Sequence, residues 1–531
     1  MLWKATIANG LWTGSNIPAY VRFRRALREP DVAQRQKLRD LIEQNANTAF
    51  GKAHDFDEIS SYEDFARRVP LSDYGTLEPW IDRIRGGEEN VLTREPVTHL
   101  IPTSGSTGAR KLIPFTAALQ REFNAALGPW LVDLARQHPG LIGGPGYWSI
   151  TPALSEHTPE SSAVPVGFRS DTEYLGGNRQ RLAEAIMAVP QSVASAKSLD
   201  EFRYETLLHL LRCRELRLIS IWHPSFLTLL LDALPTFWER LMRDIGHAQT
   251  NKLRRADPLK PETIWPHLRV ISCWGEGAAA LTLADLRKRF PTVCIQPKGL
   301  LATEAFLTFP FADQYPLAVQ SHFFEFINSE RTVIPTEEIR EGEEYEIVIT
   351  TAGGLWRYLL GDRVLVTGRL EKTPSLKFLG RKGNVSDRFG EKLSEPFVAQ
   401  ALTQLFGDNS PRFALLAPDE DELGCRYTLY VEGRPELHWV AALDRTLRRN
   451  PHYTYCRDLG QLLTPRIFQI SAQGFQSYAA HQAAHGARLG DIKPVLLSST
   501  SGWSNIFCGE YFSDSRLPES RSTFLDIAVP P

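Results

Sequence analysis

One stretch of alternating strand and helix signals restricts the fold more than any other part of this 531-residue chain. Residues 269–274 form a short apolar run that ends at Gly275, residues 278–289 have helical spacing, and residues 293–296 form a second apolar run. A strand, a glycine turn, a helix and another strand in this order are typical of an α/β protein. In such proteins ligands bind where strands end. The sequence therefore predicts an α/β fold of mixed sheets flanked by helices.

Length and composition indicate two domains. The chain is too long for one ordinary domain, and Gly380-Arg-Lys-Gly-Asn384, with glycines near both ends and cations within, is typical of a hinge. We expect a large N-terminal domain over residues 1–382 and a smaller α+β domain over residues 383–531. From about Ser498 the composition shifts to Ser, Gly and Pro, so this tail is expected to be poorly ordered.

Charge and hydropathy exclude several classes of partner. The formal net charge is -2 with no dominant block of one sign, which argues against nucleic acid as the main ligand. No run approaches the roughly 18 apolar residues that span a membrane, and the N-terminus lacks the features of a signal peptide. Six scattered cysteines are typical of thiols in a reducing cytosol, so we expect a cytoplasmic protein. The sequence leaves the oligomeric state open.

A loop at residues 103–111 is rich in hydroxyl groups, glycine and cations. It reads Thr-Ser-Gly-Ser-Thr-Gly-Ala-Arg-Lys. Glycines bring backbone N–H groups close to a ligand, hydroxyls donate to phosphate oxygens, and Arg110 and Lys111 offset polyanion charge. Lys111 does not have Walker-loop spacing, and Ser104 stands where a hydrolase elbow has its first glycine. The loop suits a nucleoside triphosphate, although the same residue types also form plain surface turns.

A helix is predicted directly after this loop. Residues 117–136 carry leucines and a phenylalanine near helical spacing. A helix that begins beside a phosphate loop would add its N-terminal dipole to anion binding.

Four motifs follow one another along the chain. They are the 103–111 loop with Ile113–Thr116; Trp265-Pro266 before a strand, then Gly275 and Ala302-Thr303-Glu304; Trp356-Arg-Tyr-Leu-Leu-Gly-Asp362; and Gly380-Arg-Lys382 followed by Gly390–Glu395. In this order they resemble the adenylate-forming superfamily. More closely, they are similar to the acyl acid-amido synthetases, the auxin-responsive family of plant hormone-conjugating enzymes and their bacterial relatives. The matches span residues 18 to about 400.

The resemblance implies an ATP-dependent ligase with an N-terminal adenylation domain and a mobile C-terminal lid. A carboxylate attacks the α-phosphorus of ATP and expels pyrophosphate, and an amino acid then attacks the acyl-adenylate to give an amide and AMP. The implied cofactors are ATP and Mg²⁺. The expected partners are a small carboxylic acid and an amino acid, with neither nucleic acid nor membrane.

The resemblance also implies roles for individual residues. Thr107 and Lys392 would act in catalysis, with Lys392 carried by the mobile domain to ATP, and Glu304 would ligate Mg²⁺. Asp362 would accept hydrogen bonds from the ribose hydroxyls, and Thr303 would reach the α-phosphate. The remaining nucleotide contacts would come from Ser104, Gly105, Ser106, Gly108, Lys111, Gly275, Glu276 and Arg381. Lys493 stands where many superfamily members carry another mobile lysine.

Each assignment has a plainer alternative. Lys111 and Lys392 could be solvated surface lysines, Glu304 an acid at a helix start, and Asp362 an ordinary turn residue after glycine. Gly275 and Glu276 could form a plain turn.

The chain departs from the family pattern at two positions. Leu300 replaces a tyrosine, so the partner that stacks on adenine comes from elsewhere, with Trp274 as a candidate. Leu359 replaces an arginine. The acid pocket is expected among residues 119–132, 149–175 and 219–230. Two rival functions stay open: an acyl-CoA ligase type of adenylate-forming enzyme, or a non-catalytic nucleotide-binding relative.

Overall fold

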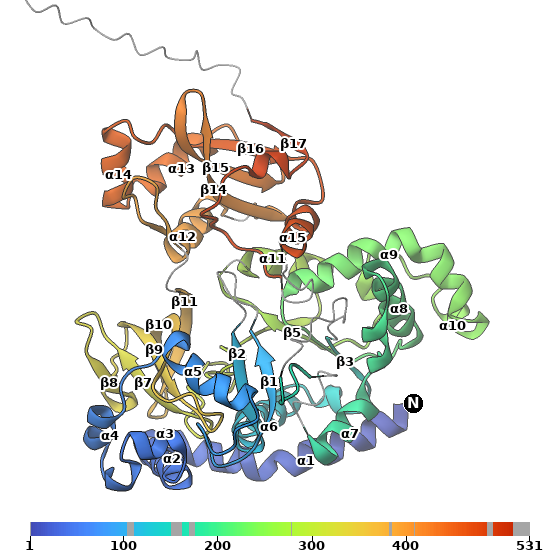
Figure 1. Ribbon diagram of the computed structural model, residues 1–531. Coiled ribbons are helices and arrows are strands. Elements are labelled where there is room, and N and C mark those ends of the chain that lie inside the picture. The colour runs from blue at the N-terminus through green and yellow to red at the C-terminus, as the bar shows by residue number, and fades with distance from the viewer. Residues whose placement is uncertain are drawn as a thin grey trace, which may run out of the picture. The chain divides into compact units, whose positions relative to one another are not determined.

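Two units, each built around its own sheets, make up the computed structural model of the chain (Figure 1). The first comprises Met1–Gly383 and Ala479–Pro494, and the second comprises Asn384–Tyr478 and Val495–Pro531. The structure describes residues 2–103, 111–149, 162–168, 176–277, 279–381, 385–407, 409–485 and 492–512.

A four-stranded parallel sheet lies in the first unit. Its order is β3 (Gly146–Trp148), β4 (Leu218–Ser220), β5 (Val270–Trp274) and β6 (Cys294–Lys298). The helices α8 (Leu199–Arg212), α9 (Pro224–Asp244), α10 (His247–Lys252) and α11 (Ala279–Arg289) belong to the same part of the chain. Ile219, Ile271 and Leu286 are buried in its core. The predicted strand–glycine–helix–strand order at 269–296 is confirmed by β5, α11 and β6, of which β5 is the buried strand.

A five-stranded antiparallel sheet follows in the same unit. Its order is β11 (Thr373–Arg381), β10 (Tyr358–Leu370), β9 (Glu344–Thr350), β7 (Phe323–Ile327) and β8 (Val333–Pro335). The strands β1 (Val97–Pro102) and β2 (Leu112–Thr116), which flank the predicted 103–111 loop in the sequence, pair antiparallel. Mixed parallel and antiparallel sheets flanked by helices confirm the predicted α/β class.

Helices cover the first unit. The N-terminal ones are α1 (Leu2–Ala26), α2 (Pro30–Asn45), α3 (Ala49–Ala53), α4 (Tyr62–Arg68) and α5 (Tyr74–Arg85), and α7 (Gly177–Ile186) packs on α1 (Figure 1). The helix predicted at 117–136 is α6 (Ala117–Gln137). It begins at once after β2 because the Thr116 hydroxyl accepts a hydrogen bond from Leu119 N at 3.0 Å.

The second unit is a smaller α+β body. Its sheet has the order β14 (Phe413–Asp421), β15 (Gly424–Glu432), β16 (Arg466–Ile470) and β17 (Gly509–Tyr511). A short ladder pairs β12 (Val385–Ser386) with β13 (Leu393–Ser394), and the helices are α12 (Glu395–Phe406), α13 (Trp439–Leu447) and α14 (Pro451–Asp458). The helix α15 (Gly474–Ala484) begins in this unit, and its residues from Ala479 on belong to the first.

Part of the tail expected to be poorly ordered has a defined structure. Trp503 is buried and stacks on Phe507, and β17 pairs with β16. The packing of these two aromatic side chains therefore orders the segment as far as Phe512, although its composition is rich in Ser and Gly.

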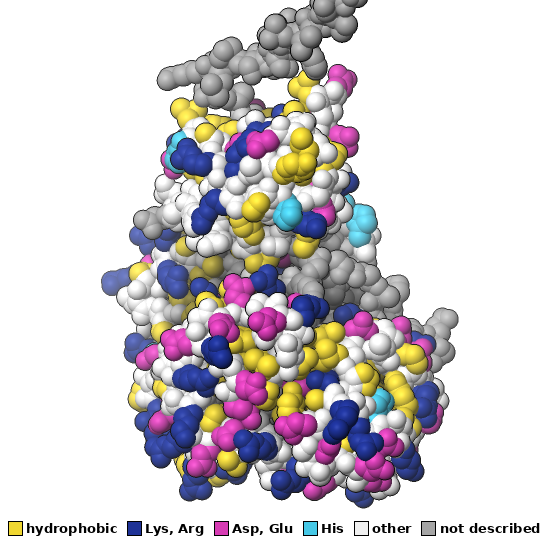
Figure 2. All heavy atoms as spheres, turned by 90° about the vertical axis from the view of Figure 1, so that its left-hand side faces the viewer, with side chains coloured by type: hydrophobic (Ala, Val, Ile, Leu, Met, Phe, Trp, Pro, Cys, Tyr) yellow, Lys and Arg dark blue, Asp and Glu magenta, His cyan; other side chains and the backbone are white. Residues whose placement is uncertain are grey.

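The surface carries charge of both signs. On the face shown in Figure 2, Lys and Arg side chains are interspersed with Asp and Glu. Among the helices in the described ranges, none combines the length and the apolar character needed to cross a membrane.

Candidate functional site

The hydroxyl-rich loop begins and ends at paired backbone positions. Thr103 N donates to Lys111 O at 2.9 Å, which closes the base of the loop at the end of the β1–β2 hairpin. Lys111 Nζ lies 5.9 Å from the centre of the Tyr74 ring. Five predicted phosphate-binding residues lie outside the described residues: Ser104, Gly105, Ser106, Thr107 and Gly108.

The motif Trp356–Asp362 divides into a buried half and a half that faces the predicted site. Trp356 is fully buried, and its indole N–H donates to Leu92 O at 3.1 Å. The Arg357 guanidinium contacts both Glu325 carboxylate oxygens, at 3.0 and 2.8 Å, and also donates to Ala66 O and Val69 O. These two residues therefore join β7, α4 and the start of β10, and their side-chain donors are engaged by protein acceptors.

Asp362 lies among charged groups at the far end of this motif. Its register partner across β10 and β11 is Arg381, with Nε 3.7 Å from Asp362 Oδ1. Burial raises the pKa of Asp362 to about 6; Arg381 and Lys493 lower it, and Glu304 raises it. Asp362 is therefore a carboxylate at neutral pH that protonates in mild acid.

Glu304 is a buried carboxylate close to Asp362. It is 4% exposed and forms no hydrogen bond or ion pair with any residue in the described ranges. It also raises the pKa of the buried Tyr358 hydroxyl. Two carboxylates so close together attract a cation or a hydrogen-bond donor.

Lys493 extends this group of charges. It lies in the segment Ala479–Pro494, which belongs to the first unit. Besides its effect on Asp362, it lowers the pKa of His223, which burial brings to about 3. His223 is therefore neutral near pH 7.

Gly275 and Glu276 connect the end of β5 to β11. A side chain at Gly275 would lie 2.6 Å from Pro297 Cβ on β6, so only glycine fits there. Glu276 Oε2 accepts a hydrogen bond from Phe378 N at 2.9 Å, and burial raises the pKa of Glu276 to about 7. Trp274, the candidate for stacking on adenine, packs edge-on against Phe378 at 5.5 Å.

Core packing and a buried hydrogen-bond chain through His322 fix the segment 300–306. Leu300 is 3% exposed within the core, so its side chain offers no face for stacking on adenine. Phe306 N donates to His322 Nε2 at 3.0 Å, and His322 Nδ1 donates to Glu122 at 2.8 Å. Both nitrogens of this buried histidine are thus engaged. Thr303 stays partly exposed beside Glu304.

The structure thus gathers Glu304, Asp362 and Arg381, with Glu276 attached to the same strand β11. Lys392 belongs to the second unit, where it is exposed and its carbonyl accepts from Asn450 Nδ2 at 3.3 Å. Tyr358 was not predicted, although its place within the third motif was a signal that could have found it.

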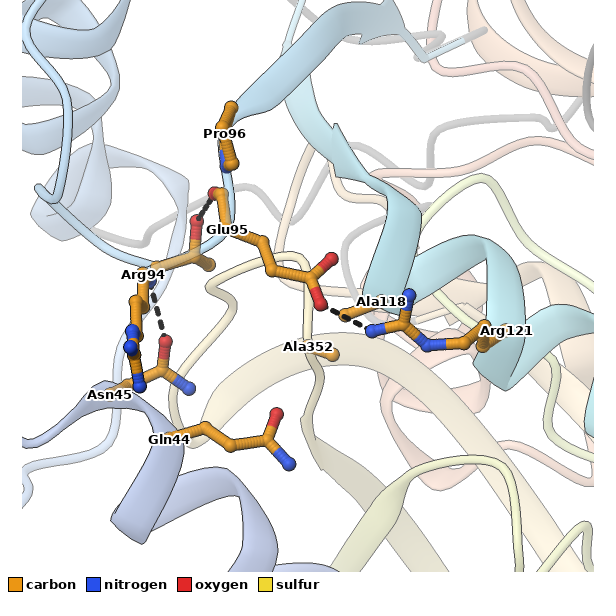
Figure 3. Close-up of a pocket in the computed structure, with 9 residues that line it drawn as sticks. Gln44, Asn45, Arg94, Glu95, Pro96, Ala118, Arg121 and Ala352 are labelled. Carbon is orange, nitrogen blue, oxygen red and sulfur yellow. Dashed lines mark hydrogen bonds and ion pairs between the residues drawn. The ribbon is translucent and has the colours of Figure 1, made fainter.

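A separate hollow of about 360 Å³ lies beside the start of α6 (Figure 3). Figure 3 shows Glu95 and Arg121, which form an ion pair there, near Ala118 and Ala352. None of the predicted nucleotide-binding residues that the structure describes lines this hollow.

Family models match three parts of the chain. They are described as the GH3 family N-terminal domain, over residues 19–256, the GH3 family central domain, over 315–381, and the GH3 family C-terminal domain, over 397–501.

The proteins of known name that are similar to this chain include GH3 amido synthetases. The chain is 24% identical to indole-3-acetic acid-amido synthetase GH3.2 of Arabidopsis thaliana, covering 72% of this chain and 80% of that protein. It is also 24% identical to the probable indole-3-acetic acid-amido synthetase GH3.4 of Oryza sativa subsp. japonica, covering 88% and 86%. The fold superposes on AtGH3.15 acyl acid amido synthetase in complex with 2,4-DB with a TM-score of 0.81 at 18% identity, covering 93% of this chain and 96% of that one. The chain belongs to the GH3 family.

Proposed function

We propose that this chain is an ATP-dependent acyl acid-amido synthetase. It would activate a small carboxylic acid as an acyl-adenylate and join it to the amino group of an amino acid. Its membership of a family whose members are named amido synthetases supports this function. The observation that carries the proposal is the group formed by Glu304, Asp362 and Arg381.

Asp362 would position the nucleotide. As a carboxylate it has acceptors only, which suits the two hydroxyls of a ribose. Arg381, on the neighbouring strand, keeps Asp362 more acidic than burial alone would make it. Charged Asp362 would then be ready to bind ATP at neutral pH.

Glu304 would hold Mg²⁺. Its buried carboxylate has no protein partner in the described ranges, and Mg²⁺ prefers oxygen ligands of this kind. Those ranges contain no cluster of three or more His, Cys, Asp or Glu for a metal, so substrate phosphates and water would complete the coordination. The ion would neutralise charge on the phosphates.

The hydroxyl-rich loop would hold the β- and γ-phosphates. Ser104, Ser106 and Thr107 would donate from their hydroxyls, Gly105 and Gly108 would let the backbone approach, and Lys111 would add charge. Thr303 would donate to the α-phosphate. Donors aimed at developing charge contribute roughly 10²–10³ in rate each.

The second unit would act as a mobile lid that supplies Lys392. A cation carried by a lid stabilises the first transition state and then leaves, so that the amine can enter. In the second step the amine nitrogen forms a bond to the acyl carbon, the carbon–oxygen bond to AMP breaks, and the amine loses a proton.

We also propose that the protein works in the cytoplasm. All six cysteines are free thiols, which suits a reducing compartment.

Two measurements test the proposal. Acid-dependent exchange of radiolabelled pyrophosphate into ATP would demonstrate adenylation, and its absence with every acid of a broad panel would contradict the proposal. The mass of the product formed with amino acids or with coenzyme A would then separate an amide ligase from a thioester ligase. An amide is expected.

A further inference from the structure

One face of the parallel sheet in the first unit carries a row of side chains that have hydrogen-bonding groups. Trp148, Ser220, Ser272 and Gln296 are register partners across β3, β4, β5 and β6. Residues in register in a parallel sheet point to the same face, and so do residues two further along each strand. Trp274 and Lys298, which are themselves paired, therefore continue this face at the carboxyl end of the sheet.

Lys298 is the charged residue of this face, and it lies among indole rings. Its Nζ donates to Ser220 Oγ at 2.8 Å and lies 5.1 Å from the centre of the Trp222 ring and 5.9 Å from that of Trp130. Trp130 is fixed because its Nε1 donates to Gln296 Oε1 at 3.1 Å. The lysine is thus held by aromatic faces and one neutral hydroxyl.

No anion within the described ranges pairs with this cation. An ammonium group has three donors, and Lys298 uses one of them on Ser220. The neighbouring Cys273 is buried, which raises the pKa of its thiol to about 12 and keeps it neutral. Burial lowers the pKa of Lys298 to about 8, so the amine still carries its charge at neutral pH. Enclosed charges in proteins are normally paired.

Two further observations indicate that a ligand completes this place. Ser272 is fully buried, and its hydroxyl has no hydrogen-bond partner within the described part of the chain. Trp222 is 46% exposed although it borders the lysine. A cleft with flat apolar walls and a few convergent polar groups is the usual form of a small-molecule site.

Chain geometry connects the surroundings of Lys298 to the proposed reaction centre. Thr303 follows Lys298 by five residues, and Trp274, the register partner of Lys298, contacts Phe378 next to Glu276. Trp130, Ser220 and Trp222 also fall within the ranges expected to form the acid pocket.

We propose that Lys298 binds a second anionic group of the acid substrate, separate from the reacting carboxylate, while the indole rings hold a flat apolar body. The class of acid would therefore be an aromatic acid with a second acidic group, such as a dicarboxylic acid. This inference rests on the proposed function for the reacting carboxylate, but its test does not require turnover.

The test compares two probes that differ by one carboxylate, benzoate and benzene-1,4-dicarboxylate. Tryptophan fluorescence titration measures binding of each to the full chain, to Lys298→Met, to Lys298→Arg and to the exposed control Lys288→Met. The wild type and the control should bind the dicarboxylate at least roughly tenfold more tightly than benzoate, which is about 1.4 kcal/mol. Lys298→Met should bind both probes equally, and Lys298→Arg should keep a preference. An unchanged preference in Lys298→Met, or none in the wild type, would overturn the proposal.

Steady-state kinetics provide a second test of the role of Lys298. In pyrophosphate exchange, Lys298→Met should raise KM for the diacid and leave kcat nearly unchanged. If Lys298→Met instead raised only the KM for the amino acid, measured in amide formation, Lys298 would belong to the acceptor site and the acid subsite would be refuted. Absence of exchange in the wild type with preserved discrimination in the titration would reject the proposed function and leave the anion site standing.

Discussion

At the scale of single residues, one motif contains residues of two kinds. Trp356 and Arg357 are buried supports, whereas Asp362 lies at the candidate site. Sequence alone could place the motif, because its order relative to the other motifs is specific. It could not assign the two halves, because Arg357 finds its partner Glu325 on a strand 32 residues away.

The first prediction concerns the ribose contact. Asp362→Ala should raise KM for ATP by about 10- to 100-fold, because hydrogen bonds to a charged group contribute about 1.5–3 kcal/mol. Pyrophosphate exchange at varied ATP concentration measures this KM. Glu330→Ala, at an exposed turn, is the control and should match the wild type. Equal KM values in the two variants would remove Asp362 from the site.

The second prediction is a pH dependence. Because the pKa of Asp362 is raised to about 6, its carboxylate is present above pH 6 and becomes protonated below it. We expect KM for ATP in the wild type to rise as pH falls through about 6, and Asp362→Asn to lack this limb. Parallel pH profiles for the two proteins would show that another group titrates.

At the scale of elements, apolar patterning identified the helices and strands well. Strands β5 and β6 and helices α6 and α11 lie within a few residues of their predicted positions. The pattern could not show how the sheets are assembled, since long-range pairing such as that of Asp362 with Arg381 leaves no local signal. The row of side chains that includes Ser220 and Ser272 on the parallel sheet could not be predicted either, because its members come from four separate strands.

The third prediction concerns the support that joins β7 to β10. Arg357→Met should destabilise the protein by about 3–5 kcal/mol, because it leaves Glu325 buried without its partner. Urea unfolding measures the change. Arg363→Met, which breaks an exposed pair with Glu344, is the matched control and should cost less than about 1 kcal/mol. If both variants lost a similar free energy of unfolding, the buried Arg357–Glu325 pair would contribute no more stability than the exposed pair.

The fourth prediction concerns the close approach of β5 and β6. Gly275→Ala should destabilise the protein by about 1–3 kcal/mol, because its methyl group would overlap Pro297. It should also raise KM for ATP by moving Glu276. Gly143→Ala adds a methyl group into open space and should change stability by no more than about 0.5 kcal/mol. A neutral Gly275→Ala in thermal unfolding would contradict the close contact.

At the scale of the whole molecule, the first unit would bind the substrates and the second would supply a mobile cation. Lys392 is the one lysine among residues 384–478, so no second ammonium group of that segment could take its place. The distinctive composition of residues 380–384 predicts a division of the chain into a large and a small part. It could not foresee that Ala479–Pro494, which contains Lys493, belongs with the first unit.

The fifth prediction tests the proposed lid. Lys392→Ala should slow pyrophosphate exchange by roughly 10²-fold while ATP binding stays measurable by calorimetry, because the cation acts on the transition state. Arg434→Ala, an exposed cation of the same unit, should behave as the wild type. Turnover by Lys392→Ala at the wild-type rate would refute this role.

The most direct measurement follows oxygen from the acid. If the carboxylate attacks the α-phosphorus and the amine later displaces AMP, one carboxylate oxygen must end on AMP. Turnover of an ¹⁸O-labelled acid with ATP and an amino acid should therefore give AMP that carries one ¹⁸O, together with an amide that retains the other. Label in inorganic phosphate, with ADP as the nucleotide product, would contradict the account.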